Sequence, residues 1–331
     1  MTKVNGEKHS TINPGDLRNH AVLVRLGTSK FGILRKDHEA TAQIAEEHGA
    51  DADMVTANKY IINPNHPAFK AIKKNLGAAS NKFRDMAGPW DNQPGGYWII
   101  TTKGLPTLQA AMLEFEKTHN QLVNDFIDQL PEIIDDAKRK LGGKNAKGHS
   151  FFDAAMIPSP NELRNKFGFR MDIEILPDSG NIVLDLDAKR SKAIAKAATA
   201  TNDARYQALA EYTHTKVQGE LTAMAKNMRE FGDDIEGSKR GRSFKDGLVG
   251  RMTALSNLLP ALNITGDPRL DALGVEIAKT LANQTGDELR GNRVAGDQRT
   301  KEIREANALS AREKAGNSAE KLLGDIDSVF G

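Results

Sequence analysis

Two pairs of carboxylates stand two positions apart in this chain, Asp51 with Asp53 and Asp185 with Asp187. On a strand that spacing places both side chains on one face, where they could share a divalent cation. Asp187, however, directly precedes a helical pattern that begins at Ala188, and Asp51 and Asp53 equally suit a cap or a turn. We prefer the capping interpretation, and a metal-dependent enzyme that uses Asp185 and Asp187 remains an alternative.

A second stretch, Gly143 to Ser150, has the glycine spacing of a phosphate-binding loop. His149 occupies the position where such a loop carries its lysine, and the preceding pattern is helical where a strand is required. A flexible linker therefore explains this stretch better than a nucleotide site.

The densest basic patch lies near residue 240 and could contact phosphates, with Phe244 as a stacking platform. Its basic members are Lys239, Arg240, Arg242, Lys245 and Arg251. Asp233, Asp234 and Glu236 precede it and partly neutralise its field. A solvated loop is the preferred interpretation, and nucleic-acid binding through this patch is the main alternative function.

Other chemistry-bearing residues are interpreted as core. His119 falls in the apolar seam of a helix and is expected to be a packed, hydrogen-bonded histidine. Trp90, Tyr97 and Trp98 gather around a Gly-Gly turn and form either an exposed hot spot or the core of a small sheet, which we favour. The chain has no cysteine, so thiol nucleophiles and Cys-ligated zinc are excluded. We expect no cofactor and no bound metal.

Composition limits the class of protein. The formal net charge of +2 argues against a nucleic-acid-binding surface spread over the whole chain. The polar start of the chain lacks the apolar region of a secretory signal. No stretch approaches the roughly 20 apolar residues that a membrane span needs. We therefore expect a cytoplasmic protein that does not enter a membrane.

The expected fold is α+β and mostly helical, with a small antiparallel sheet, long helical hairpins and a helical C-terminal half. We expect a flexible arm over residues 1–20, an α+β domain over 21–187 with a protruding helical hairpin, and a helical region over 188–331. Every Tyr and Trp precedes residue 213, so we expect the first half of the chain to be the better-packed globular part.

Local patterns predict the elements of the first domain. Residues 21–26 and 31–34 suggest two strands joined by a turn at Gly27–Lys30. Asp37 should cap a helix that ends near Gly49, and a second helix should cover 68–86. Residues 97–102 suggest a strand, and residues 177–181 have the composition of a tight hairpin turn.

Two helical seams alternate by four and three residues, the spacing of antiparallel helix pairs. The first runs from Leu108 to Phe126, and Pro131 should break its helix after Leu130. The second is a candidate interaction seam, expected to pack on the first or on another copy of the chain. Its members are Val217, Leu221, Met224, Met228, Phe231 and Ile235.

One short run near the middle of the chain, PSPNELRNKFGF from Pro158 to Phe169, is the most distinctive. Ser159 can cap a helical turn, Pro160 suits the first helical position, and Glu162 completes a capping box. Alternating residues follow, which predicts a strand.

This run closely resembles a motif of a phage and bacterial family known only as a domain of unknown function. The motif positions that match are Pro158, Ser159, Pro160, Glu162, Leu163, Arg164, Lys166, Phe167 and Phe169. Upstream segments match in the same order, so the resemblance covers the chain from about Ala21 to the helix near Ile235.

The resemblance implies partners rather than chemistry, because no catalytic residue is assigned to that family. Its members are typically encoded beside a MoxR-type AAA+ ATPase and a protein with a von Willebrand A domain. It thus implies a non-enzymatic phage or mobile-element protein in a bacterial host cell, an adaptor or scaffold that works with such an ATPase system or assembles with itself.

Overall fold

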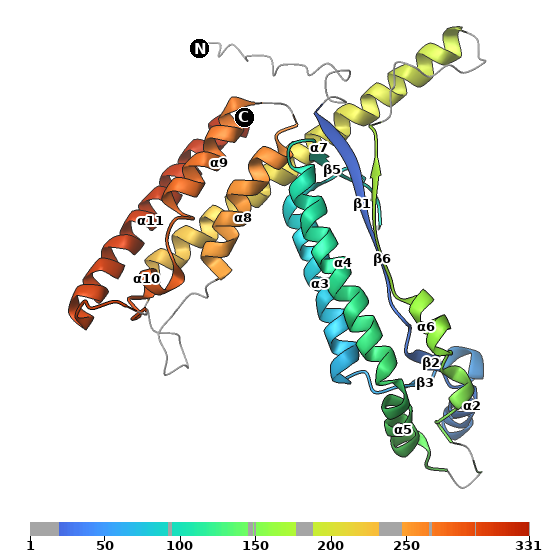
Figure 1. The fold of residues 1–331 in the computed structure, drawn as a ribbon. Helices are drawn as coiled ribbons and strands as arrows, with labels where there is room; N and C mark the ends of the chain where they lie inside the picture. Colours follow the sequence, from blue (N-terminus) through green and yellow to red (C-terminus); the bar gives the residue numbers. More distant parts are fainter. Residues whose placement is uncertain are drawn as a thin grey trace. The chain divides into compact units, whose positions relative to one another are not determined.

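The structure is a computed structural model and describes residues 20–91, 95–144, 148, 150–176, 188–231, 247–264, 267–294 and 296–330, the last four by their backbone alone. Within these residues the fold is α+β and mostly helical, as predicted, with ten α-helices and a small antiparallel sheet (Figure 1). The predicted arm before His20 and the hairpin turn at 177–181 lie outside the described residues.

The chain forms two compact units, each assembled from several segments. Unit 1 contains residues 1–25, 83–108 and 173–331, and unit 2 contains residues 26–82 and 109–172. The boundary expected at residue 187 thus falls within unit 1.

The sheet has the strand order β4-β5-β1-β6. Its strands are β4 (Gly88–Pro89), β5 (Trp98–Thr101), β1 (Ala21–Ser29) and β6 (Gly168–Glu174). β1 and β5 are antiparallel, with Ala21 opposite Thr101 and Val24 opposite Trp98. The strand predicted at 97–102 is therefore confirmed.

The hairpin predicted at Gly27–Lys30 is wrong. β1 continues through Gly27 to Ser29 instead of turning, because its neighbour β6 supplies partners for this stretch. Ser29 Oγ donates to the Lys166 carbonyl oxygen at 3.1 Å, just before β6 begins. The second strand lies later in the sequence than the predicted residues 31–34. It is β2 (Leu34–Lys36), and it pairs with β3 (Asn58–Tyr60).

The helices of unit 1 pack around one apolar cluster. They are α7 (Ala188–Arg229), α8 (Gly247–Leu262), α9 (Pro268–Thr280), α10 (Gly286–Arg290) and α11 (Lys301–Phe330). α7 packs chiefly on α11, and α8 packs on α9 (Figure 1). The helix predicted to begin after residue 187 is confirmed, whereas α10 was not predicted.

The interaction seam on α7 is core within this chain. Val217, Leu221 and Met224 are fully buried, Met228 is buried, and Phe231 is half-buried against the same cluster. Ile235 lies outside the described residues. The seam of α4 (Leu105–Asp128) contributes its C-terminal part, with Phe126 and Leu122, to the other cluster instead, so the two seams are not packed on each other there.

The aromatic group near the Gly-Gly turn belongs to the core of unit 1, as we favoured. Trp90 is buried and meets Tyr206 edge to face at 5.5 Å between ring centroids. Trp98 makes similar contacts with Phe83 at 5.9 Å and with Tyr212 at 6.3 Å. These pairs join Trp90, which directly follows β4, and Trp98 of β5 to α7 and to the end of α3 (Pro67–Met86), which belongs to unit 1 from Phe83 onward.

Unit 2 is built on two long helices, α3 (Pro67–Met86) and α4. Asn75 Nδ2 donates to the Phe115 carbonyl oxygen at 3.0 Å and links the two. The predicted break is confirmed, because α4 ends at Asp128 and α5 (Leu130–Leu141) begins with Pro131 in its first turn. The smaller elements are α2 (His38–Glu47), η1 (Ala52–Met54), η2 (Ala154–Met156) and α6 (Pro160–Lys166).

Among the helices of the described residues, none is both long and apolar enough to cross a bilayer.

Candidate functional site

The basic patch predicted near residue 240 is described only at its last member. Lys239, Arg240, Arg242 and Lys245 lie outside the described residues. Arg251 is on α8, and its Nε is 3.4 Å from Glu220 Oε2 on α7, so its charge is paired within unit 1.

The carboxylate pairs do not form a described metal site. Asp51 caps η1, because its Oδ1 accepts a hydrogen bond of 3.0 Å from the Asp53 backbone N–H. Asp185 and Asp187 lie outside the described residues, and so does His149 of the candidate phosphate-binding loop. In the part of the chain that the structure covers, no three His, Asp or Glu side chains gather in a way that could hold a metal ion.

The PSPNELRNKFGF run performs an architectural role in unit 2. The predicted capping box is present: Glu162 Oε2 accepts from the Ser159 N–H at 2.9 Å, and Ser159 Oγ accepts from the Glu162 N–H at 3.4 Å. Leu163 and Phe167 are buried in the cluster of unit 2. Phe167 meets Phe126 of α4 edge to face at 5.5 Å. The motif therefore fixes α6 and the start of β6 on the helices.

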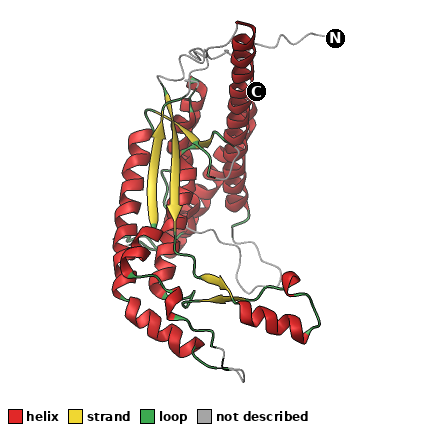
Figure 2. Ribbon diagram, turned by 90° about the vertical axis from the view of Figure 1, so that its right-hand side faces the viewer, coloured by secondary structure: helices red, strands yellow, loops and turns green. Residues whose placement is uncertain are grey.

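A small lobe of unit 2, residues 34–60, is held together by buried polar groups. We call it the β2–β3 lobe. Asp37 caps α2 through a 2.9 Å bond from the Ala40 N–H to its Oδ1, and its Oδ2 lies 2.9 Å from Lys59 Nζ. Thr41 Oγ1 donates to the Asp37 carbonyl at 2.6 Å and accepts from the Ala57 N–H at 3.0 Å. These bonds tie both strands to α2. Figure 2 shows the two short strands beside this helix.

The same lobe carries exposed apolar side chains, and we call the side of the β2–β3 ribbon that carries Leu34 and Tyr60 its outer face. Leu34 and Tyr60 lie opposite each other in the β2–β3 pairing and are 49 % and 48 % exposed. Ile44 on α2 and Met54 in η1 are also exposed, and Met54 is 86 % exposed. Directly opposite side chains on a two-stranded ribbon lie about 5 Å apart at Cβ, so Leu34 and Tyr60 form one continuous apolar surface.

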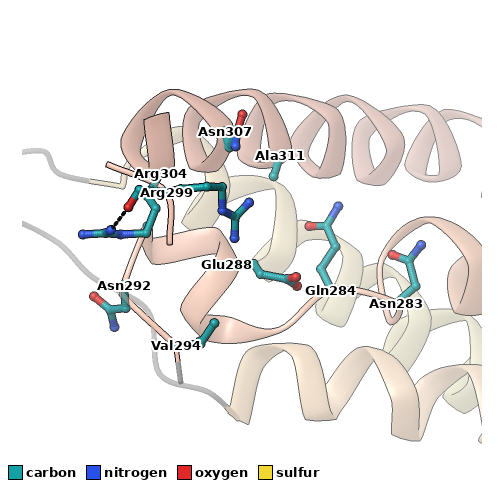
Figure 3. A pocket seen from close by; sticks show the side chains of 10 residues that line it. Asn283, Gln284, Glu288, Asn292, Val294, Arg299, Arg304, Asn307 and Ala311 are labelled. Atoms are coloured by element: carbon teal, nitrogen blue, oxygen red, sulfur yellow. Dashed lines mark hydrogen bonds between the residues drawn. The ribbon is translucent and has the colours of Figure 1, made fainter. Parts of the chain in front are cut away.

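A polar pocket of about 320 Å³ lies in unit 1, between α10, the loops on both sides of it and the first half of α11 (Figure 3). Its lining residues are Asn283, Gln284, Glu288, Gly291, Asn292, Val294, Arg299, Arg304, Asn307 and Ala311. Gly291 ends α10 with φ 73°, a left-handed conformation that favours glycine. The chain can therefore turn sharply at this point and line the pocket from two sides.

Most charged groups of this pocket are already engaged. Glu288 Oε2 accepts from the Thr285 N–H at 2.9 Å in a second capping box. The side-chain and backbone hydrogen bonds from Arg299 hold the pKa of Asp297 at about 2, far below its ordinary value. Arg304 Nη1 donates to the Arg299 carbonyl at 2.6 Å. The buried Arg304 Nε and Gln284 Oε1 have no hydrogen-bond partner among the described residues.

Neither the β2–β3 lobe nor the polar pocket was predicted from the sequence. The β2–β3 lobe needs a strand pairing between residues 34 and 60 that no local pattern specifies. The pocket had one local signal, because Thr285 and Glu288 have capping-box spacing and could have identified α10.

No family model, curated protein or solved structure matches this chain.

Proposed function

We propose that this chain is a non-enzymatic interaction protein, an adaptor or scaffold, that binds a protein partner through the β2–β3 lobe. The observation that carries the proposal is the exposed Leu34–Tyr60 pair on a frame fixed by buried polar bonds. Binding sites gain affinity when their apolar side chains are already positioned, because less conformational freedom is lost on association.

The composition of the lobe also suits a protein interface. Tyrosine is enriched at the centres of such interfaces, and a polar rim commonly surrounds it. Here Lys36 and Asn58 are exposed on the same face, two pairing positions beyond Leu34 and Tyr60. The resemblance to the phage and bacterial family favours an AAA+ ATPase or a von Willebrand A-domain protein as the partner, with a second copy of the chain as the alternative.

The experiment is co-purification of the tagged full chain from bacterial cells that also express an ATPase of that type and its A-domain protein. Leu34→Ser with Tyr60→Ser should abolish capture of the partner. Leu113→Ser is the matched control, because Leu113 is also 49 % exposed but lies on α4. Capture that survives the double substitution, or that is lost equally in the control, would overturn the proposal.

Self-assembly is tested on the same variants by sedimentation. If the wild-type chain forms oligomers that the double substitution dissociates and no other protein is captured, the partner is a second copy of the chain.

A further inference from the structure

A cationic face runs along α3 in unit 2. The chain has no Asp or Glu from Met54 to Arg84. Within this interval, exposed lysines on α3 are Lys70, Lys73, Lys74 and Lys82. Helices usually carry acidic residues in their first turn, where the helix dipole is positive, but α3 has none there. Lys70 therefore adds its charge to the positive end of the dipole.

These lysines project away from the core. Phe69, Ile72 and Leu76 mark the buried side of the helix, and Asn75 on that side bonds to α4. At about 100° per residue, Lys70 and Lys74 lie almost opposite this buried side, with Lys73 and Lys82 on the two flanks. Lys73 Nζ is 5.9 Å from the centroid of the Phe69 ring.

The four charges are not neutralised. No ion pair links any of them to another residue in the described parts of the chain, whereas Lys117 on α4 is 2.9 Å from Glu114 and Lys140 on α5 is 2.7 Å from Asp136. Lys70 and Lys82 are separated by roughly 18 Å along the helix axis. That length corresponds to about five phosphate steps along one strand of a duplex.

The residues in the middle of this lysine face are small and exposed. Gly77 and Ala78 are exposed, and a Cβ added at Gly77 would meet no atom within 4 Å. The face carries none of the exposed large apolar side chains of the described residues. Protein interfaces depend on such side chains, whereas binding to a phosphate backbone depends mainly on positive charge.

We propose that the lysine face of α3 binds the phosphate backbone of double-stranded nucleic acid without regard to sequence. Lysine suits this task as a mobile point charge that does not require one fixed geometry. This site is distinct from the β2–β3 lobe and from the basic patch predicted near residue 240.

The test is fluorescence anisotropy with a labelled random-sequence DNA duplex and the full chain, over a series of salt concentrations. If all four lysines contact phosphates, affinity should fall roughly 150-fold between 50 and 200 mM salt. In the double variant Lys70→Gln with Lys74→Gln, two phosphate contacts remain. The decrease in affinity over the same salt range should then be only roughly tenfold.

The matched control is Lys117→Gln with Lys140→Gln, which removes the same net charge from unit 2 but takes lysines that are ion-paired. The control should bind the duplex with the salt dependence of the wild-type chain. An equal loss of affinity for the duplex in both double variants, or no loss of affinity in either, would overturn the inference. Displacement of the duplex by polyglutamate at equal charge concentration would also overturn it, because the face would then prefer an acidic polypeptide.

Discussion

Lys59 Nζ lies 2.9 Å from Asp37 Oδ2, and the two side chains are only 8 % and 2 % exposed. The same carboxylate caps α2 through its other oxygen. One buried aspartate thus fixes the start of a helix and the neighbouring β3 strand, which positions the outer face of the β2–β3 lobe.

Asp37→Asn should lower the free energy of unfolding by about 3–5 kcal/mol, because it leaves the buried Lys59 charge without its partner. Urea unfolding followed by circular dichroism measures this change. Asp51→Asn is the control, since Asp51 caps η1 at an exposed position and asparagine can still cap. Adding Lys59→Met to Asp37→Asn should recover part of the loss; a double variant no more stable than the single would contradict the argument.

A glycine at the edge of the sheet is required by its surroundings. A Cβ at Gly88 would lie 2.2 Å from Leu209 Cδ1 and 3.0 Å from Leu262 Cδ2. Both leucines are buried, so they have little room to move. Gly88→Ala should therefore cost about 1–3 kcal/mol of stability by overpacking.

Gly77→Ala is the opposite case on α3. Its added methyl group meets nothing, and alanine restricts the unfolded chain more than glycine does. We expect a gain of about 0.5–1 kcal/mol. Thermal unfolding of both variants checks the pair, and a melting temperature lowered equally by both substitutions would show that local packing at Gly88 is not the cause.

Local rules predicted the elements whose causes are local. The capping residues Asp37 and Ser159 stand next to the groups they bond, so the starts of α2 and α6 could be read directly. The turn predicted at Gly27–Lys30 is wrong because the conformation of this stretch depends on residues that are distant in the sequence. Its composition favours a turn, but pairing with β6, about 140 positions later, keeps the strand extended.

The candidate sites depended even more on distant residues. The Leu34–Tyr60 surface exists only because β2 pairs with β3. The seam from Val217 to Phe231 had the right periodicity, but periodicity alone does not distinguish a helix that packs on its own chain from one that packs on a partner.

Asp297, the partner of the pocket residue Arg299, gives a prediction about the pH dependence of stability. Its side chain accepts hydrogen bonds from Arg299, which lower its pKa from the ordinary 3.8 to about 2. Its contribution to stability is therefore complete above pH 3.8 and is lost as the pH falls through 2. Carboxyl NMR titration should show a midpoint near 2 for Asp297. In Arg299→Gln the midpoint should move back toward 3.8; an unchanged midpoint would show that Arg299 is not the cause.

His119 on α4 is packed as predicted. It is 1 % exposed, and its ring lies 5.8 Å from that of Phe169. Burial lowers its pKa, and this effect exceeds the opposing effects of the Phe167 backbone and the Glu116 carboxylate.

A histidine with a lowered pKa takes up a proton more readily in the unfolded chain. Stability should thus be complete above the ordinary pKa of 6.5 and should decrease as the pH falls below it. His119→Leu removes the titrating group, so the difference in melting temperature between pH 7 and pH 5 should be smaller than in the wild-type chain. A proton NMR titration of the His119 ring gives the direct measurement. A midpoint at or above 6.5 would show that burial in unit 2 does not hold this imidazole neutral.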